Sequence, residues 1–406
     1  MNVGTNHSSF DYVFVGGGLQ TGLMTAAILH HQPSARIAII ERDSQLAGNH
    51  TWSFHESDIS PSCHTWFTPF VETQWPAYDV IIGNLRRTVQ LGYVSMSSQH
   101  FRQAIGHLAD SHDVAILTGS AANLVTTDEV YLENGQRLEA CVVFDNRGPE
   151  QLNLQTFEGG FQKFWGFEVE LPSDWPSTRP VIMDDRIEQS DGFRFLYTLP
   201  FEPRRVLIED TRFSNDPSLD RGNCLAEVTS YLTHHGFRQW HICREEHGIL
   251  PMPTQGFLPG SSLPKLAGGY RGGWFHAATG YSFPFAIELA ELVATVPADR
   301  LAASLRHFSS QHARRASFAR FLNRLLFDLV KPEKRYQIFR RFYCVLSEPR
   351  LSRFYRHQFN TIDAFRIVVG LPPGGLQPRN FFRSLVSSYS PRSPQSDSVS
   401  AKRVLT

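Results

Sequence analysis

Near its N-terminus the chain passes directly from an apolar strand through a glycine turn into a helix. Residues 11–15 are the strand, Gly16-Gly17-Gly18 form the turn, and residues 22–29 have helical composition. A proline and a serine interrupt this pattern before a second apolar strand at residues 36–40, which ends at Glu41. This order predicts a βαβ unit and therefore an α/β fold.

The glycine turn has the features of a dinucleotide site. Glycines allow a tight turn and a close approach of the backbone, while the N–H groups at the helix start hold a pyrophosphate. Glu41 stands where an acidic residue accepts a hydrogen bond from a ribose hydroxyl, although Thr21 occupies the third glycine position. The alternative is a generic glycine turn in an α/β sheet. The predicted binding residues are Gly16, Gly17, Gly18, Thr21, Gly22 and Glu41.

Strand signals and composition divide the remaining chain. Asn134-Gly135 is a strong hairpin signal, residues 88–96 are expected to form one strand, and residues 160–215 are strand-like and rich in aromatic side chains. Residues 49–85 lack clear periodicity and are interpreted as a long structured loop that faces a ligand. The expected regions are 10–85 and 86–150 for the nucleotide-binding domain and its β-meander, 151–245 for an inserted antiparallel sheet, 246–300 for a return to the nucleotide-binding domain, 301–372 for a basic helical region, and 384–406 for a Ser-rich disordered tail.

Composition argues against several classes of protein. Lysine plus arginine and aspartate plus glutamate number 39 each, so the global charge does not favour nucleic acid. The 5 cysteines are scattered without a C-x-x-C pair, so we expect reduced thiols and no metal site. The polar N-terminus does not resemble a signal peptide, and no stretch approaches the roughly 18 apolar residues that cross a bilayer. We therefore expect a cytoplasmic protein and leave binding to a membrane surface open.

Four blocks, in order along the chain, resemble segments of the bacterial lycopene β-cyclases. They are residues 46–54 (LAGNHTWSF), residues 206–211 (VLIEDT), residues 247–252 (HGILPM) with Gly268-Gly269 and residues 276–282 (HAATGYS), and the basic segment 331–340 (KPEKRYQIFR). One departure is Ala277, where the family usually has proline. The resemblance covers residues 10–372.

This resemblance implies a Rossmann-type FAD-binding domain with an inserted antiparallel-sheet substrate domain and a basic helical C-terminal region. It implies FAD in its reduced form as the cofactor, with NAD(P)H as a candidate reductant. The segment after residue 247 looks like the second flavin-contacting segment of the family. It adds the expected cofactor residues Gly268, Gly269, His276, Thr279, Gly280 and Tyr281.

The reaction of the family is redox-neutral. The linear ψ end group of lycopene is protonated, the carbocation closes a ring, and loss of a proton leaves a β-ring, which gives γ-carotene and then β-carotene. By this resemblance the acid is Glu209, in a catalytic pair with Asp210. A carboxyl stays protonated near neutral pH when it is buried beside a negative charge, which Asp210 would supply. Since adjacent strand residues point to opposite faces, we expect Glu209 to face the substrate. The alternative is an ordinary hydrogen-bonded strand carboxylate.

A carbocation also needs stabilisation without a nucleophile that would trap it, and aromatic faces supply this. Aromatic residues of the strand-like segment and of the block at residues 46–54 are the candidates, with ordinary core packing as the alternative. The predicted pocket residues are His50, Trp52, Trp165, Phe193, Phe195 and Tyr197.

Residues 314–356 hold 12 lysines or arginines against 3 acidic residues, interleaved with Phe and Tyr. Such a surface suits anionic lipid headgroups, and a carotenoid must be drawn from the bilayer. We therefore expect peripheral binding at the cytoplasmic side of a membrane, with a solvated basic helix face as the alternative. No nucleic-acid recognition motif accompanies the charge, so nucleic acid is not an expected partner. The oligomeric state does not follow from the sequence.

Two other functions are compatible with these motifs. An FAD-dependent monooxygenase or another oxidoreductase acting on a hydrophobic substrate would share the βαβ unit and the inserted sheet. A non-catalytic flavin-binding or carotenoid-carrying protein would share them too, and for it Glu209 would be dispensable.

Overall fold

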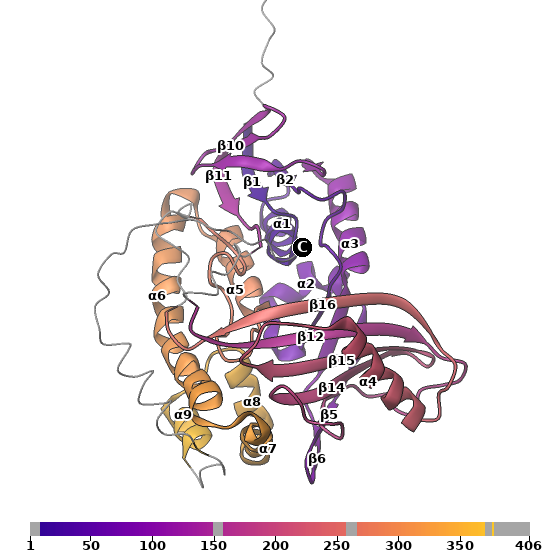
Figure 1. The fold of residues 1–406 in the computed structure, drawn as a ribbon. Helices are drawn as coiled ribbons and strands as arrows, with labels where there is room; N and C mark the ends of the chain where they lie inside the picture. The colour runs from indigo at the N-terminus through magenta and orange to yellow at the C-terminus, as the bar shows by residue number, and fades with distance from the viewer. Residues whose placement is uncertain (1–8, 149–156, 257–265, 370–375, 377–406) are drawn as a thin grey trace, which may run out of the picture.

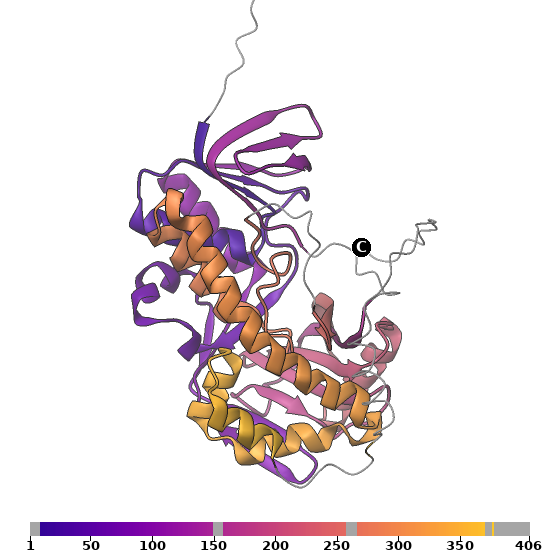
Figure 2. The same cartoon turned by 90° about the vertical axis from the view of Figure 1, so that its left-hand side faces the viewer.

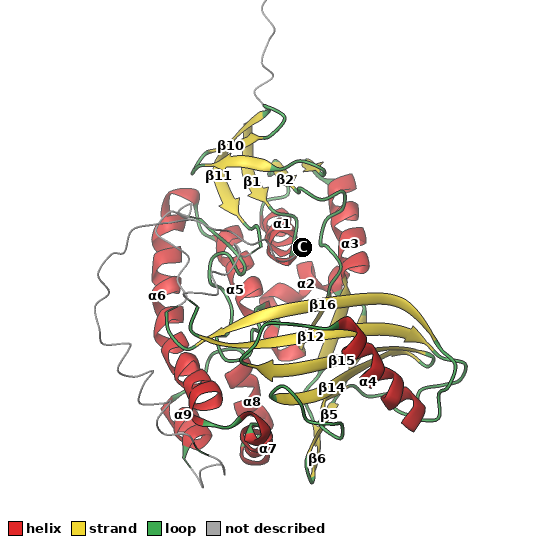
Figure 3. Cartoon of the chain, in the orientation of Figure 1, coloured by secondary structure: helices red, strands yellow, loops and turns green. Residues whose placement is uncertain are grey.

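The computed structural model describes residues 9–148, 157–256, 266–369 and 376. Within these residues the chain builds a first sheet near the N-terminus and a longer sheet below it, with helices beside both (Figures 1 and 3). The expected disordered tail, residues 384–406, lies outside the described residues.

The first sheet contains the predicted βαβ unit. Its strands are β1 (Ser9–Val15), β2 (Ile37–Ile40), β8 (Val114–Leu117), β9 (Ala122–Val125), β10 (Glu129–Leu132) and β11 (Arg137–Asp145). Their order is β8-β2-β1-β11-β10-β9, with β8, β2, β1 and β11 parallel to one another. The hairpin predicted at Asn134-Gly135 is confirmed, because β10 and β11 are antiparallel neighbours.

Helices cover one face of the first sheet and form a shared core with it. They are α1 (Leu19–His31), α2 (His64–Phe67), α3 (Ser98–Ser111) and α5 (Phe283–Thr295). Gly22 of α1 lies against Phe101 of α3, and a Cβ at Gly22 would overlap the ring of Phe101. The side chain of Ser97 caps α3 by accepting a hydrogen bond from the backbone N–H of His100 at 3.2 Å. Gly22 therefore permits close helix packing.

The region expected to be a long loop, residues 49–85, holds regular structure. A small sheet has the order β3-β7-β4. Its strands are β3 (Thr51–His55), β4 (Thr73–Trp75) and β7 (Tyr93–Ser97), and short helical turns follow at η1 (Glu56–Asp58), η2 (Pro61–Cys63) and η3 (Thr68–Phe70). These elements are three to five residues long, which is too short to produce a clear periodicity in sequence.

The expectation of one strand over residues 88–96 is also wrong. The chain instead forms β6 (Leu85–Val89) in the long sheet and β7 in the small sheet. Between them the backbone turns at Gly92, whose carbonyl accepts a hydrogen bond from the N–H of Glu56 at 2.9 Å. A Cβ at Gly92 would overlap the Glu56 carboxylate, so the glycine allows this change of sheet.

The long sheet is antiparallel except for one parallel pair, β13 with β5. Besides β6, its strands are β5 (Tyr78–Ile82), β12 (Gly159–Glu170), β13 (Val181–Asp184), β14 (Phe193–Glu202), β15 (Arg205–Ser214) and β16 (His241–Pro253). Their order is β16-β12-β15-β14-β13-β5-β6. Residues 78–89 thus join this sheet, although the sequence placed them in the nucleotide-binding domain. Helix α4 (Arg221–His234) packs on one face.

Helices follow β16 and run along the side of the molecule, where α6 reaches from the first sheet to the long sheet (Figure 2). They are α6 (Ala298–Asn323), the π-helical turn η4 (Arg324–Leu329), η5 (Pro332–Lys334), α7 (Tyr336–Val345), α8 (Glu348–Tyr355) and α9 (Thr361–Val368). Asn323 ties the end of α6 to both neighbouring segments, because its amide donates to the carbonyls of Pro253 at 2.9 Å and Ala277 at 2.7 Å. Among the described helices, none combines the length and the apolar character needed to cross a membrane.

The contact between α1 and α3 predicts different effects on stability of the same substitution at two helical glycines. Gly106→Ala in α3 should stabilise the protein by about 1 kcal/mol, because alanine favours the helix and its Cβ meets no described atom within 4 Å. Gly22→Ala should leave the protein about 1–3 kcal/mol less stable than Gly106→Ala, because its Cβ must displace the buried Phe101. Urea unfolding of both variants measures the difference, and equal stabilities would contradict the packing.

Candidate active site

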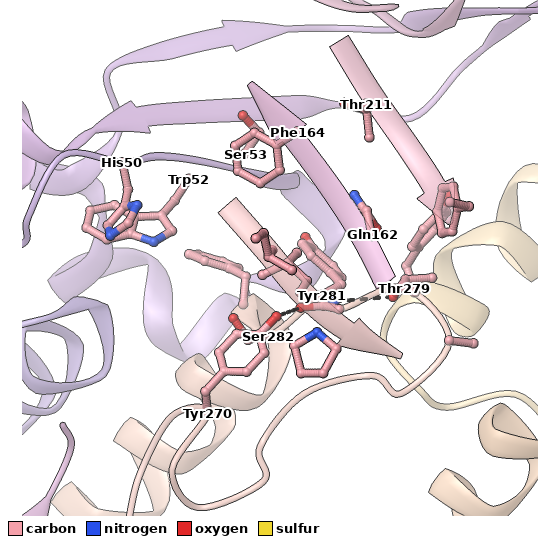
Figure 4. Close-up of a pocket in the computed structure, with 18 of the residues that line it drawn as sticks. His50, Trp52, Ser53, Gln162, Phe164, Thr211, Tyr270, Thr279, Tyr281 and Ser282 are labelled. Carbon is pink, nitrogen blue, oxygen red and sulfur yellow. Dashed lines mark hydrogen bonds between the residues drawn. The ribbon is translucent and has the colours of Figure 1, made fainter. Parts of the chain in front are cut away.

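A cavity of about 2090 Å³ extends from the glycine turn after β1, along the long sheet, to α7 and α9. In Figure 4, His50 and Trp52 lie next to each other on one side, and Gln162, Phe164 and Thr211 project from the long sheet. The predicted site residues that line the cavity are Gly16, Gly18, Glu41, His50, Trp52, Phe195, Tyr197, Glu209, Gly269, Thr279, Gly280 and Tyr281. The predicted site residues outside its lining are Gly17, Thr21, Gly22, Trp165, Phe193, Asp210, Gly268 and His276.

The glycine turn presents a free helix start to the cavity. Gly18 is the N-cap of α1, the first turn of α1 has no acidic residue, and a Cβ at Gly18 would meet no atom of the described residues within 4 Å. Gly16 has a φ of 99°, and its Cβ would lie 2.8 Å from the backbone of Asn146 and Arg147. Backbone N–H groups beside open space at the start of a helix fit a pyrophosphate.

The carboxylate of Glu41 is held at the edge of this turn. It accepts hydrogen bonds from the N–H of Gly17 at 2.7 Å and from the N–H of Asp43 at 3.0 Å. Glu41 and the exposed Asp43 both line the cavity beyond the turn. Their position suits the ribose end of a dinucleotide.

Other predicted cofactor residues support the turn from behind. The hydroxyl of Thr21 donates to the carbonyl of Gly16 and accepts a hydrogen bond from the amide of Asn146 at 2.9 Å. A Cβ at Gly268 would overlap the side chain of Asn146. Thr21 and Gly268 therefore fix the glycine turn and the segment at Gly268 in place against Asn146. Neither Thr21 nor Gly268 lines the cavity.

The turn before α5 forms the opposite wall of the nucleotide end, with Tyr270, Thr279, Tyr281 and Ser282 beside the cavity (Figure 4). His276 lies behind it, fully buried, and its ring contacts the rings of Phe354 and His357. Burial lowers the pKa of His276 to about 3, so the ring is neutral. Its Nδ1 accepts a hydrogen bond from the N–H of Ala278 at 3.2 Å. The structure thus places His276 as a support of the turn, which corrects its assignment as a cofactor-lining residue.

A row of residues crosses the long sheet on the side of the cavity. In the strand register, Tyr197 of β14 lies opposite Glu209 of β15, Glu209 opposite Gly166 of β12, and Gly166 opposite Glu246 of β16. The two glutamates are therefore separated only by a residue without a side chain. Both side chains lie on the cavity side of the sheet, close enough for Glu246 to act on the ionisation of Glu209.

This contact changes the ionisation of Glu209. Burial raises the pKa of Glu209 well above its usual range, and the neighbouring Glu246 acts in the same direction, against a smaller opposite effect of Arg244. Glu246 is buried and accepts hydrogen bonds from Arg244 at 2.7 Å and from the Thr51 hydroxyl at 2.9 Å. Glu209 is thus a carboxyl at the wall of the cavity whose surroundings favour its protonated form.

Asp210 does not supply the neighbouring charge expected from the sequence. Its side chain points to the other face of the long sheet, where Arg194 donates to Oδ1 at 3.0 Å and Arg212 donates to Oδ2 at 2.9 Å. Burial opposes ionisation of Asp210, but these hydrogen bonds outweigh it and hold its pKa below the usual value. Asp210 is therefore a structural carboxylate in a buried ion-pair network, which corrects its assignment to the catalytic pair.

The predicted aromatic residues divide between the two faces of the sheet. Phe195 and Tyr197 line the cavity, and the hydroxyl of Tyr197 lies 3.1 Å from that of Tyr93 on β7. Phe193 is buried behind the lining and stacks on Phe339 of α7. Trp165 points to the opposite face, where its ring stacks on His247 and its Nε1 donates to Glu245 at 3.2 Å. Neither Phe193 nor Trp165 lines the cavity.

The sequence did not identify a second buried carboxyl near the cavity, Asp58. The hydroxyl of Tyr281 donates to Asp58, and the backbone N–H of His55 donates to Asp58 at 3.0 Å. Burial raises the pKa of Asp58 to about 7, although these hydrogen bonds act to lower it. Asp58 and Tyr93 lie in segments without a distinctive motif, and Glu246 stands just before the block at residues 247–252, so only the tertiary contacts reveal them.

Comparison with known proteins gives consistent matches over most of the chain. The family described as "Lycopene cyclase protein" matches residues 11–379. A lycopene beta-cyclase of Pseudescherichia vulneris is 37% identical over 372 residues, which cover 89% of this chain and 94% of that protein. A lycopene beta-cyclase of Pantoea ananas is 34% identical, with 90% of this chain and 95% of that protein covered.

Solved structures share the fold at low sequence identity. A geranylgeranyl bacteriochlorophyll reductase-like protein from Thermoplasma acidophilum has a TM-score of 0.59 at 11% identity, with 95% of this chain and 97% of that chain covered. A flavin-dependent brominase has a TM-score of 0.58 at 12% identity, with 94% and 99% covered. These likenesses confirm the predicted fold class.

The raised pKa of Asp58 predicts a pH-dependent effect of Asp58→Asn on stability. Because burial raises this pKa from 3.8 to about 7, the stability contributed by the protonated carboxyl is present at low pH and is lost as the pH rises through about 7. Asparagine stays neutral, so the variant should gain on the order of 1–3 kcal/mol relative to the wild type between pH 5 and pH 8. Denaturant unfolding at both pH values measures this. An equal difference at the two pH values would rule out a buried carboxyl that ionises in this range.

Proposed function

Because the chain belongs to the lycopene cyclase family, we propose that it is a lycopene β-cyclase, which converts the ψ end groups of lycopene to β-rings without net oxidation or reduction. The product of one cyclisation is γ-carotene and that of two is β-carotene. The observation that carries this proposal is the position of Glu209 at the wall of a large cavity, where burial and the neighbouring Glu246 raise the pKa of its carboxyl. A catalyst for this reaction needs such a proton donor near neutral pH.

The residues around Glu209 suit the steps that follow protonation. The proton leaves Glu209 for the terminal double bond of the end group, and the electron pair of a second double bond closes the ring. Phe195 and Tyr197 line the cavity on the strand next to that of Glu209, and their aromatic rings would stabilise the positive charge without forming a bond to it. Loss of a ring proton then leaves the new double bond, so one proton is given and one is returned.

The nucleotide end of the cavity supports FAD as the cofactor. Gly16 and Gly18 leave space for the pyrophosphate, Glu41 lies near the ribose position, and Gly269, Thr279, Gly280 and Tyr281 line the wall beyond them. Reduced FAD would supply a negative charge or an acid-base group next to the substrate, with NAD(P)H as its reductant. The role of these residues is to bind and orient the dinucleotide and to close the cavity around it.

The end of the cavity near α9 supports binding to a membrane surface. Large apolar side chains are exposed here at helical spacing, with Ile362 61% exposed and Phe365 63% exposed. The exposed Arg366 stands beside them, and Arg341 of α7 donates to its carbonyl at 3.1 Å. An apolar helix face with flanking arginines suits the interface of an anionic bilayer. Since Ile367 and Val368 also line the cavity, the cavity offers a carotenoid a path from this face of the protein towards Glu209.

The function predicts products from an anaerobic assay. Purified protein, lycopene in liposomes and chemically reduced FAD should give γ-carotene and β-carotene, detected by chromatography, with no net reductant consumed. Glu209→Gln should lower the rate by about 100-fold or more, because general acid catalysis contributes at least this factor. Lycopene that stays linear until NAD(P)H and oxygen are added would instead identify a monooxygenase. Full activity of Glu209→Gln would refute the acid role.

The apolar face of α9 predicts which side chains hold the protein on a membrane. Phe365→Ser and Ile362→Ser should each weaken binding to phosphatidylglycerol vesicles by about tenfold, because each removes a large apolar side chain from the lipid. Leu124→Ser is the matched control, since Leu124 is 53% exposed on the first sheet, away from α9. Sedimentation with vesicles measures the binding. Equal losses at all three positions, or none, would contradict a membrane contact through α9.

A further inference from the structure

We propose that Glu246 is the positioning residue that keeps the proton on Glu209, and that Gly166 is the gap in the sheet through which the two carboxyls meet. The inference rests on the proposed function for its role in cyclisation, since Glu209 is the proton donor there. The contact itself is a property of the folded chain, so it can be tested without the substrate.

The strand register is the first argument. Gly166 faces Glu209 on one side and Glu246 on the other, in the central strand of β15, β12 and β16. A Cβ at Gly166 would lie 2.8 Å from Cγ and 3.3 Å from Oε1 of Glu209, so any larger residue would occupy the space that the carboxyls share. The φ of Gly166 is not positive, and the backbone therefore does not require glycine here. The absence of a side chain serves the contact between the glutamates.

The surroundings of Glu246 keep its carboxylate in place. Arg244 donates to it at 2.7 Å and to Glu168 at 2.8 Å, so a single guanidinium is shared by two carboxylates on the edge strand and its neighbour. The hydroxyl of Thr51, on β3, donates to the same oxygen of Glu246 at 2.9 Å. Glu246 is 4% exposed, so this charge is poorly screened by water.

The other titratable groups that face Glu209 do not replace this effect. Tyr93 of β7 and Tyr197 of β14 are buried, and burial raises the pKa of both phenols, so they are neutral. Arg244 of β16 is the cation near the pair, and it acts to lower the pKa of Glu209. Glu246 is therefore the charged group that favours the protonated form.

The pair also explains how Glu209 can regain its proton. After protonation of the substrate, two carboxylates would face each other in a buried site, which is unfavourable. The ionised Glu209 is then a strong acceptor for the proton that the ring releases. Glu209 thus loses one proton and gains one in each cyclisation, and Glu246 keeps its ion pair with Arg244 throughout.

The experiment compares Glu246→Gln with Glu245→Gln. Glu245 is adjacent but points to the opposite face of β16, where it pairs with Arg221. In Glu246→Gln the amide keeps the shape and removes the charge, so the pKa of Glu209 should fall. Cyclisation requires protonated Glu209, and its loss with rising pH should therefore begin lower by about one pH unit or more. Glu245→Gln should keep the wild-type pH profile.

Infrared spectroscopy measures the protonation of Glu209 in the absence of lycopene. The C=O stretch of the protonated Glu209 carboxyl is assigned as the band that Glu209→Gln removes. During a pH titration this band should disappear at lower pH in Glu246→Gln and in Gly166→Ala than in the wild type. Gly166→Ala retains both carboxyls and separates them, so it tests the contact if Glu246→Gln does not fold.

The possible outcomes separate the two proposals. The role of Glu246 would be overturned if the carboxyl band of Glu209 titrated with the wild-type midpoint in Glu246→Gln, or in Gly166→Ala if only that variant folds. This holds even if the protein cyclises lycopene. A shifted midpoint in a protein that leaves lycopene linear would support the carboxyl pair and refute the proposed function. A shift in Glu245→Gln as large as in Glu246→Gln would also overturn the inference, because a general change in charge would then explain it.

Discussion

The juxtaposition of two glutamates across Gly166 in the long sheet is the feature on which the site depends. Backbone pairing brings Glu209 of β15 and Glu246 of β16 to the same level of β12, and Gly166 leaves the space between them empty. A sheet usually separates residues two strands apart by the side chain between them. Because Gly166 has no side chain, Glu209 and Glu246 can approach each other across β12 at the wall of the cavity.

The cavity exists because distant segments of the chain are fixed to one another. Asn323 joins the end of α6 to β16 and to the turn after His276 through two backbone carbonyls. Arg335, fully buried at the start of α7, donates to the carbonyl of Phe213 at the end of β15 at 3.0 Å. These polar contacts hold the helical region against the long sheet, so the apolar lining from α7 faces Phe195 and Glu209.

Two adjacent carboxyls illustrate how environment decides chemistry. Glu209 and Asp210 are neighbours in β15, yet their side chains face opposite sides of the sheet. Two guanidinium groups hold the pKa of Asp210 below its usual value, whereas burial and the neighbouring carboxyl of Glu246 raise the pKa of Glu209. On the face of the sheet that α4 covers, Asp210 forms ion pairs with Arg194 and Arg212. These ion pairs neutralise its buried charge, so Asp210 has a structural role. The acid on the cavity side is free to take part in a reaction.

The sequence by itself determined the βαβ unit, the hairpin at Asn134-Gly135 and the family, and it pointed to Glu209 as the candidate acid. These follow from local patterns, because glycine spacing, strand alternation and ordered motifs are properties of short segments. Only the tertiary structure decided the partner of Glu209, the position of His276 behind the cavity, and the membership of β5 and β6 in the long sheet. The reason is physical: strand register and burial arise from contacts between segments far apart in the chain. Glu246 is 37 residues from Glu209 in the sequence, and no local pattern reports that β12 brings their carboxyls together.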